Sequence, residues 1–320
     1  MSKKRVKTIC IYNNKGGVGK STVAINLCQT LADMGKKVIA IDNDSQNSFS
    51  FLCNLPVFES GAIDDPKNGH KDLGWLIADY YWHGNKPTYQ AVKKTIVTPK
   101  YHKSVRDPNN SMHWIEAEKN FGFDLIPGFN KDLSLTEMTF MARSNDYYIL
   151  RPNNRVKSRE ALKMVVDVLK AYYDYEYIII DCAPNLGLNS IQALIAGNEL
   201  IIPVTPDFLS SAGLSNIIGN LIDLHQIIPS FNVLGVLFNM YSSTKADDRL
   251  IADIEEYGRE MDLRIFSTRL PRVNQMRRLS SEDGISVLTN EKPFRMFNAR
   301  MKRLANEIMD IEEEIDAKGE

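Results

Sequence analysis

The strongest structural signal in the sequence is the stretch Lys15-Gly16-Gly17-Val18-Gly19-Lys20-Ser21-Thr22. It follows the apolar run 6–12, which predicts a buried strand, and precedes a segment in which apolar residues recur at helical spacing. Backbone N–H groups at a helix start converge with the helix dipole on one point, and glycine lets that backbone approach a phosphate closely. The stretch therefore predicts a phosphate-binding loop, in which Lys20 reaches the terminal phosphates and the Ser21 hydroxyl ligates Mg²⁺.

The loop departs from the ordinary Walker A pattern at its start. Asn14 stands where that pattern has glycine, and Lys15 adds a second lysine. One lysine suffices to hold the β- and γ-phosphates. Lys15 therefore needs a role of its own.

Composition narrows the class of protein. A chain of 320 residues, 43% of them hydrophobic, has room for one large α/β domain or two small ones. A net charge of −1 excludes a globally basic nucleic-acid binder, so any such binding would come from local patches. The cysteines show no C-x-x-C spacing, which favours a reducing cytosol over a disulfide framework or a zinc site. We expect neither a signal peptide nor a membrane span.

Strands and helices are expected to alternate along the chain. Besides 6–12, near-continuous apolar runs predict strands at 37–42, 177–181, 200–204 and 233–238, with helices at 158–173 and 210–227. Such strands, split by helices, favour an α/β fold with a mostly parallel twisted sheet and helices on both faces. Ligands of these sheets bind beyond the carboxyl ends of the strands, where Asp42 and Asp181 stand.

Two segments break this rhythm within what we expect to be a single domain, 1–320. Segment 55–121 holds all three tryptophans and many basic residues, and reads as an insertion with short helices near 73–81 and 89–94. A final helix, 292–316, carries an apolar seam that either packs on its own domain or meets a partner. Its polar side becomes acidic, which argues against docking on a membrane.

Three carboxylates are candidates for a metal and water site. Asp181 follows the apolar run 178–180, the position of the acid that holds Mg²⁺ in phosphate-loop proteins. Alternation along an extended chain would put Asp42 and Asp44 on one face, toward the phosphates. The alternatives are an acidic strand cap at Asp181 and a simple turn at 42–46.

Together these motifs resemble the ParA family of partition ATPases, a branch of the deviant Walker A group that also contains MinD and the nitrogenase iron protein. The resemblance rests on 14–22, 41–46 and 177–184, with weaker matches at 200–204 and 270–272, and covers most of the chain except 55–121. It implies a P-loop NTPase-like domain that uses ATP and Mg²⁺. It also implies a slow, partner-stimulated ATPase that is cytoplasmic and associated with the nucleoid.

The resemblance also implies roles for single residues. Lys15 would reach across an ATP-bound homodimer to the other subunit's nucleotide, and Asp44 would position the hydrolytic water with Asp42 beside it. Mg²⁺ would be held by Ser21, Asp42 and Asp181. The nucleotide would be held by Gly16, Gly17, Val18, Gly19, Lys20, Ser21, Thr22, Asn239, Pro271 and Arg272. Ser45 replaces the family's usual proline, which puts the rigidity of that loop in doubt.

Two stretches without acidic residues are candidates for non-specific DNA binding. Stretch 263–281 carries five arginines, and stretch 80–106 mixes lysines with aromatic residues. The candidate contacts are Arg269, Arg277, Arg278, Lys93 and Lys94. Each stretch could instead be a solvated basic face, and the second could contact a cargo adaptor.

The leading hypothesis is a partition ATPase that segregates plasmid or chromosomal DNA with a DNA-bound, ParB-like adaptor. The alternatives are a MinD-like spatial regulator on a membrane, which the acidic tail disfavours, and an ATP-switched scaffold that positions a protein cargo on the nucleoid. An iron-protein-like reductase would need a pair of cluster cysteines, and none is evident.

Overall fold

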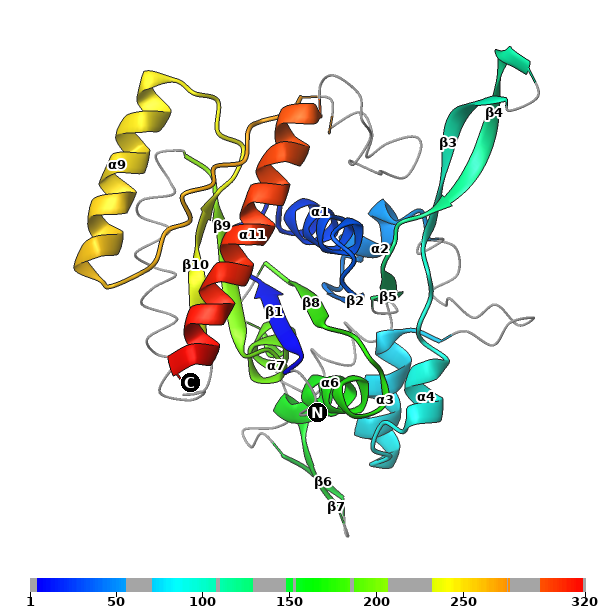
Figure 1. Ribbon diagram of the computed structural model, residues 1–320. Coiled ribbons are helices and arrows are strands. Elements are labelled where there is room, and N and C mark those ends of the chain that lie inside the picture. Colours follow the sequence, from blue (N-terminus) through cyan, green and yellow to red (C-terminus); the bar gives the residue numbers. More distant parts are fainter. Residues whose placement is uncertain are drawn as a thin grey trace.

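A parallel sheet forms the centre of the molecule (Figure 1). The computed structural model describes residues 5–55, 71–107, 110–128, 148–151, 154–184, 187–206, 232–274, 276 and 294–318. The strand order is β10-β9-β1-β8-β2-β5, and every neighbouring pair is parallel. The bounds are β1 Lys7–Ile11, β2 Val38–Asn43, β5 Asp124–Ile126, β8 Tyr177–Cys182, β9 Glu199–Val204 and β10 Asn232–Phe238.

Five of these strands confirm the sequence prediction, each end lying within one residue of the expected position. Strand β5 was not predicted, because its three residues are too few to show a period. It pairs with β2 at the edge of the sheet. The prediction of a mostly parallel α/β sheet is therefore correct.

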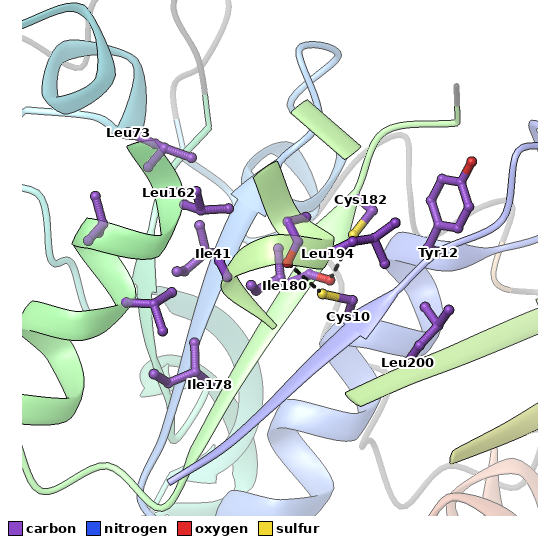
Figure 2. Close-up of a cluster of buried hydrophobic side chains, with 14 of the residues drawn as sticks. Cys10, Tyr12, Ile41, Leu73, Leu162, Ile178, Ile180, Cys182, Leu194 and Leu200 are labelled. Carbon is purple, nitrogen blue, oxygen red and sulfur yellow. Dashed lines mark hydrogen bonds between the residues drawn. The ribbon is translucent and has the colours of Figure 1, made fainter. Parts of the chain in front are cut away.

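Helices cover both faces of the sheet. Helices α1 (Lys20–Asp33) and α11 (Arg295–Lys318) pack on one face. The other face carries α3 (Leu73–His83), α6 (Ala161–Tyr172), α7 (Leu188–Ala196) and α9 (Lys245–Glu260). Figure 2 shows this second core, where Cys10 and Ile180 from adjacent strands meet Leu162 and Leu194 from the covering helices. Side chains of one strand alternate between the two cores, as the period of an extended chain requires.

The C-terminal helix packs on its own domain. Met301, Leu304 and Ile308 of its apolar seam are fully buried in the core that contains α1. The helix ends at Lys318, close to the expected 316. The helix expected at 210–227 lies outside the described residues. In the part of the chain that the structure describes, no helix is long and apolar enough to cross a membrane.

The segment between β2 and β5 holds small elements of its own. It contains α2 (Ser48–Leu52), α3, α4 (Tyr89–Lys93) and a hairpin of β3 (Lys100–Asp107) and β4 (Asn110–Asn120). Figure 1 shows this hairpin projecting from the body of the molecule. The two predicted short helices correspond to α3 and α4, whereas α2 and the hairpin were not predicted. A second hairpin, β6 (Tyr148–Arg151) and β7 (Asn154–Lys157), precedes a 3₁₀ turn at Ser158–Glu160 and then α6.

Candidate functional site

The loop between β1 and α1 has the backbone of an anion cradle. Gly17 and Gly19 have positive φ angles of 76° and 84°. A Cβ on Gly19 would lie 2.5 Å from the Asn239 Nδ2 atom, so only glycine fits there. Gly19 caps α1 without a side-chain hydrogen bond. The first N–H groups of α1 are thus available to a bound anion.

Two asparagines hold the loop in this shape. The Asn13 Nδ2 group donates to the Pro203 carbonyl at 2.7 Å, and its Oδ1 atom accepts from the Lys15 N–H at 2.8 Å. The Asn239 Nδ2 group donates to the Val18 carbonyl at 2.8 Å. The loop is therefore tied to the ends of β9 and β10. Sequence reasoning missed Asn13, since a lone polar residue after a buried strand gives no specific signal.

A cavity of about 740 Å³ opens over the loop. Its size suits a ligand such as a nucleotide. The predicted residues that line it are Gly16, Gly17, Gly19, Lys20, Ser21, Thr22, Asp44, Asn239, Pro271 and Arg272. Lining residues that sequence reasoning missed are Ile25, Asn26, Gln46, Ser48, Phe51, Leu52, Pro184, Met240, Val273, Asn274 and Met276. The structure thus brings together residues from five separate parts of the chain.

Lys20 provides the positive charge on the cavity floor. Its side chain is buried, and the Nζ group donates to the Lys15 carbonyl at 3.3 Å. Burial lowers the pKa of Lys20, while the nearby charges of Asp181 and Asp44 raise it. A poorly hydrated ammonium group attracts an anion more strongly than one in water does.

Asp181 is a buried carboxylate whose charge is compensated only in part, by the Ser21 hydroxyl and Lys20. It lies beside Asp42 in the register of β8 and β2, and neither of its oxygens accepts a well-formed hydrogen bond from the described residues. Burial and then the charge of Asp42 raise the pKa of Asp181 well above its usual value, against a lowering by the Ser21 hydroxyl. Carboxylate and hydroxyl oxygens are ligands that Mg²⁺ prefers. Asp181 and Ser21 therefore fit this ion, which when bound would neutralise charge on phosphate oxygens.

Asp42 lies differently from the prediction. Its Oδ2 atom accepts from the Ser50 N–H at 2.8 Å and from the Ser50 hydroxyl at 2.6 Å, and the residue is fully buried. The Gly128 N–H in turn donates to the Ser50 hydroxyl at 3.1 Å. Burial raises the pKa of Asp42 to about 6. The chain turns back into α2 after Asp44, so only Asp44 lines the cavity, and the predicted shared face is wrong.

Asp44 has the position of a residue that could orient water. Its Oδ1 atom accepts from the Gln46 N–H at 2.9 Å. Burial raises the pKa of Asp44, whereas the Gln46 hydrogen bond and the Lys20 charge lower it. A carboxylate at the cavity wall can accept a hydrogen bond from a water molecule beside the phosphates.

The segment 265–274, which we call the base-side segment, contributes residues 271–274 to the lining of the cavity. It runs beside β10 and the turn that follows, where the Tyr241 N–H donates to the Leu270 carbonyl and the Arg272 N–H to the Tyr241 carbonyl, both at 2.9 Å. Pro271 and Arg272 line the cavity from this segment.

The candidate DNA contacts are scattered. Arg269 is engaged within the domain, since its guanidinium pairs with Glu255 at 2.8 Å and lies over the rings of Phe238 and Tyr241. Lys93 and Lys94 are exposed at the end of α4. Arg277 and Arg278 lie outside the described residues.

Comparison with known proteins agrees with this geometry. Residues 6–232 match the AAA domain family. The sporulation initiation inhibitor protein Soj of Bacillus subtilis is 27% identical, over 98% of this chain and 99% of that protein. The chromosome partitioning protein ParA of Myxococcus xanthus is 24% identical, over 83% of this chain and 75% of that protein.

A solved structure shares the fold. The septum site-determining protein MinD of Pyrococcus horikoshii, complexed with Mg-ADP, superposes with a TM-score of 0.62 at 19% identity, over 96% of this chain and 98% of that one. The sequence match, the strand order of the sheet and the phosphate loop all indicate the same family. The chain belongs to the AAA domain family and is a P-loop ATPase of the ParA/MinD kind.

Proposed function

We propose that this protein binds Mg²⁺-ATP, forms a homodimer around it, and binds DNA non-specifically as that dimer. With a DNA-bound, ParB-like adaptor that stimulates hydrolysis, it segregates plasmid or chromosomal DNA. The observation that carries the proposal is the different placement of the two loop lysines relative to the cavity.

Lys20 and Lys15 stand in different places relative to the cavity. Lys20 lines the cavity floor, whereas Lys15 is half-buried at the start of the loop and is not among the described residues that line this cavity. A chain that already has Lys20 for its own phosphates gains little from a second lysine outside the site. In a dimer, Lys15 can stabilise charge on the other subunit's nucleotide, as an arginine finger does.

The residues in and beside the cavity then have distinct tasks. Lys20 and the loop N–H groups hold the phosphates, while Ser21 and Asp181 hold Mg²⁺. Asn239, Pro271 and Arg272 contact the base. Asp44 orients a water molecule that attacks the γ-phosphorus, and ADP leaves with phosphate as the second product. Asp42 acts from behind the cavity wall, through its hold on Ser50.

Two alternative functions would use the same ATP site. A MinD-like regulator would bind a membrane, but the last turns of α11 expose Glu313 and Glu314, which anionic lipid repels. An ATP-switched scaffold would bind DNA without turnover. The name of the Myxococcus relative, chromosome partitioning protein, favours partition over both.

A sedimentation assay separates these functions. The protein is mixed with ATP or ADP and centrifuged with plain DNA or with anionic liposomes. We expect it to sediment with DNA in ATP only and to stay in solution with liposomes. Sedimentation with liposomes in ATP, and none with DNA, would contradict the proposal in favour of the membrane function.

Charge reversal then locates the DNA surface. Arg277→Glu with Arg278→Glu should abolish sedimentation with DNA while ATP still binds, because phosphate contacts depend on those charges. Lys93→Glu with Lys94→Glu is the matched test of the α4 surface. Unchanged DNA binding by the arginine pair would remove that stretch from the interface.

A further inference from the structure

We infer that Glu307 of α11 is a positioning residue for nucleotide binding, which it serves by holding the base-side segment at a fixed distance from the phosphate loop. The inference rests on the proposed binding of ATP and adds a residue that neither the loop motif nor the cavity lining includes. Glu307 lies on a different element from every residue assigned to the site so far.

The carboxylate of Glu307 captures two successive backbone groups. Its Oε1 atom accepts from the Ser267 N–H at 2.6 Å, and its Oε2 atom accepts from the Thr268 N–H at 3.1 Å. One turn earlier on the helix, Arg303 donates to the Ser267 hydroxyl at 3.4 Å. A carboxylate that accepts two N–H groups makes charge-assisted bonds, which are stronger than neutral ones.

These bonds fill a gap in the pairing of the segment with β10. The Phe266 N–H donates to the Val236 carbonyl at 2.9 Å, and the Leu270 N–H donates to the Phe238 carbonyl at 2.8 Å. Between these two contacts the Ser267 and Thr268 N–H groups turn to Glu307 instead. Thr268 is fully buried, so its N–H would cost free energy if it had no acceptor.

The position of Glu307 is set by the packing of its helix. Leu304 and Ile308, on either side of it along α11, are fully buried and share a core with Leu27 and Leu31 of α1. Helix α11 packs across α1 (Figure 1). Since α1 begins at Lys20 and α11 carries Glu307, the packed pair of helices connects the phosphate loop to the base-side segment.

A variant without the Glu307 carboxylate should lose the positioning of the base-side segment and keep the phosphate loop intact. Inorganic tripolyphosphate needs only the phosphate loop, whereas ATP also needs the base-side segment. The ratio of the two affinities therefore reports on positioning and is insensitive to a general loss of folded protein.

The experiment measures the binding of ATP and of tripolyphosphate, each with Mg²⁺, by calorimetry. Glu307→Ala should weaken ATP binding about tenfold and leave tripolyphosphate binding unchanged. Glu307→Gln should recover part of the loss, because its amide oxygen accepts one N–H. Glu314→Ala is the matched control on the same helix: it removes the exposed pair with Arg264 and should change neither affinity.

The results separate the positioning role of Glu307 from the proposed binding of ATP on which it rests. Wild-type protein that binds tripolyphosphate but not ATP would overturn the proposed function. Unchanged ATP binding by Glu307→Ala, or an equal loss for both ligands, would overturn the positioning role alone. If the alanine variant does not fold, the affinity ratio of Glu307→Gln decides in the same way.

Discussion

Buried carboxylates lie at both ends of the central sheet, but their hydrogen bonds and charged neighbours differ. At the amino end, Glu312 accepts from the Tyr177 hydroxyl at 2.7 Å, and Lys7 pairs with Asp316 at 2.8 Å. Arg5 stands 3.9 Å from Glu199 and 3.5 Å from Asp316. Lysine and arginine side chains thus lie near the carboxylates there, although neither oxygen of Glu199 accepts a hydrogen bond from the described residues.

At the carboxyl end, Asp44 and Asp181 lie near Lys20, and Asp42 lies beside Asp181. Asp42 accepts hydrogen bonds from Ser50 and Asp44 accepts one from the Gln46 N–H, but neither Asp181 oxygen accepts a well-formed hydrogen bond from the described residues. The contacts at the amino end therefore hold α11 against the sheet. The carboxyl end is a site whose charge is complete only with a bound cation, and such uncompensated groups are typical of functional sites.

The largest expected effect is the removal of the Lys20 charge from the carboxyl end. Lys20→Ala should abolish ATP binding, because the phosphates would lie near Asp44 and Asp181 without the compensating charge of Lys20. Calorimetric titration with ATP measures it. The matched control at the amino end is Lys36→Ala, which breaks a partly exposed pair with Glu176 and should leave ATP binding intact. If Lys20→Ala still bound ATP, the carboxyl end of the sheet would not be the nucleotide site.

Neutralising Asp181 should have the next largest effect on nucleotide binding. Asp181→Asn should stabilise the nucleotide-free protein by about 1 kcal/mol at pH 8, since it removes a buried carboxyl group whose burial Lys20 and Ser21 offset only in part. The same change should weaken the Mg²⁺ dependence of ATP binding at least severalfold. Thermal unfolding and titrations with and without Mg²⁺ test both parts. A lower melting temperature for Asp181→Asn would show that its charge is already compensated.

The smallest effect on nucleotide binding is expected at the amino end, where only the free energy of unfolding should depend on pH. Burial raises the pKa of Glu312 from 4.5 to about 7. The folded protein thus keeps a proton that the unfolded chain releases, so stability should fall as pH rises from about 4.5 to 7, by about 3 kcal/mol from this group. Glu312→Gln should flatten that part of the profile in urea unfolding from pH 5 to pH 8. An unchanged slope would assign the pH dependence to other groups.

The sequence predicted those parts of the molecule that have a strong local signal. The apolar runs located β1, β2, β8, β9 and β10, and the glycine-lysine loop located the phosphate cradle. Strand β5 was missed because three residues show no period, and α9 because charged residues fill most of its surface around Ile251 and Ile254. The β3–β4 hairpin was missed among the mixed aromatic and basic residues of its segment.

The site was predicted less completely, because distant contacts decide it. Strand alternation pointed Asp42 toward the cavity, but Ser50, brought back by α2, captures its carboxylate. Asn13 and Glu307 act through backbone groups of segments far away in the chain. No local pattern shows which backbone group a side chain will meet.

The central claim is that Lys15 serves the nucleotide of a second subunit. The most direct measurement is the molar mass of Lys15→Ala in solution with ATP and Mg²⁺, by light scattering, beside its ATP affinity and hydrolysis rate. We predict a monomer that binds ATP with wild-type affinity and does not hydrolyse it. A Lys15→Ala protein that dimerises and hydrolyses ATP normally would contradict the account.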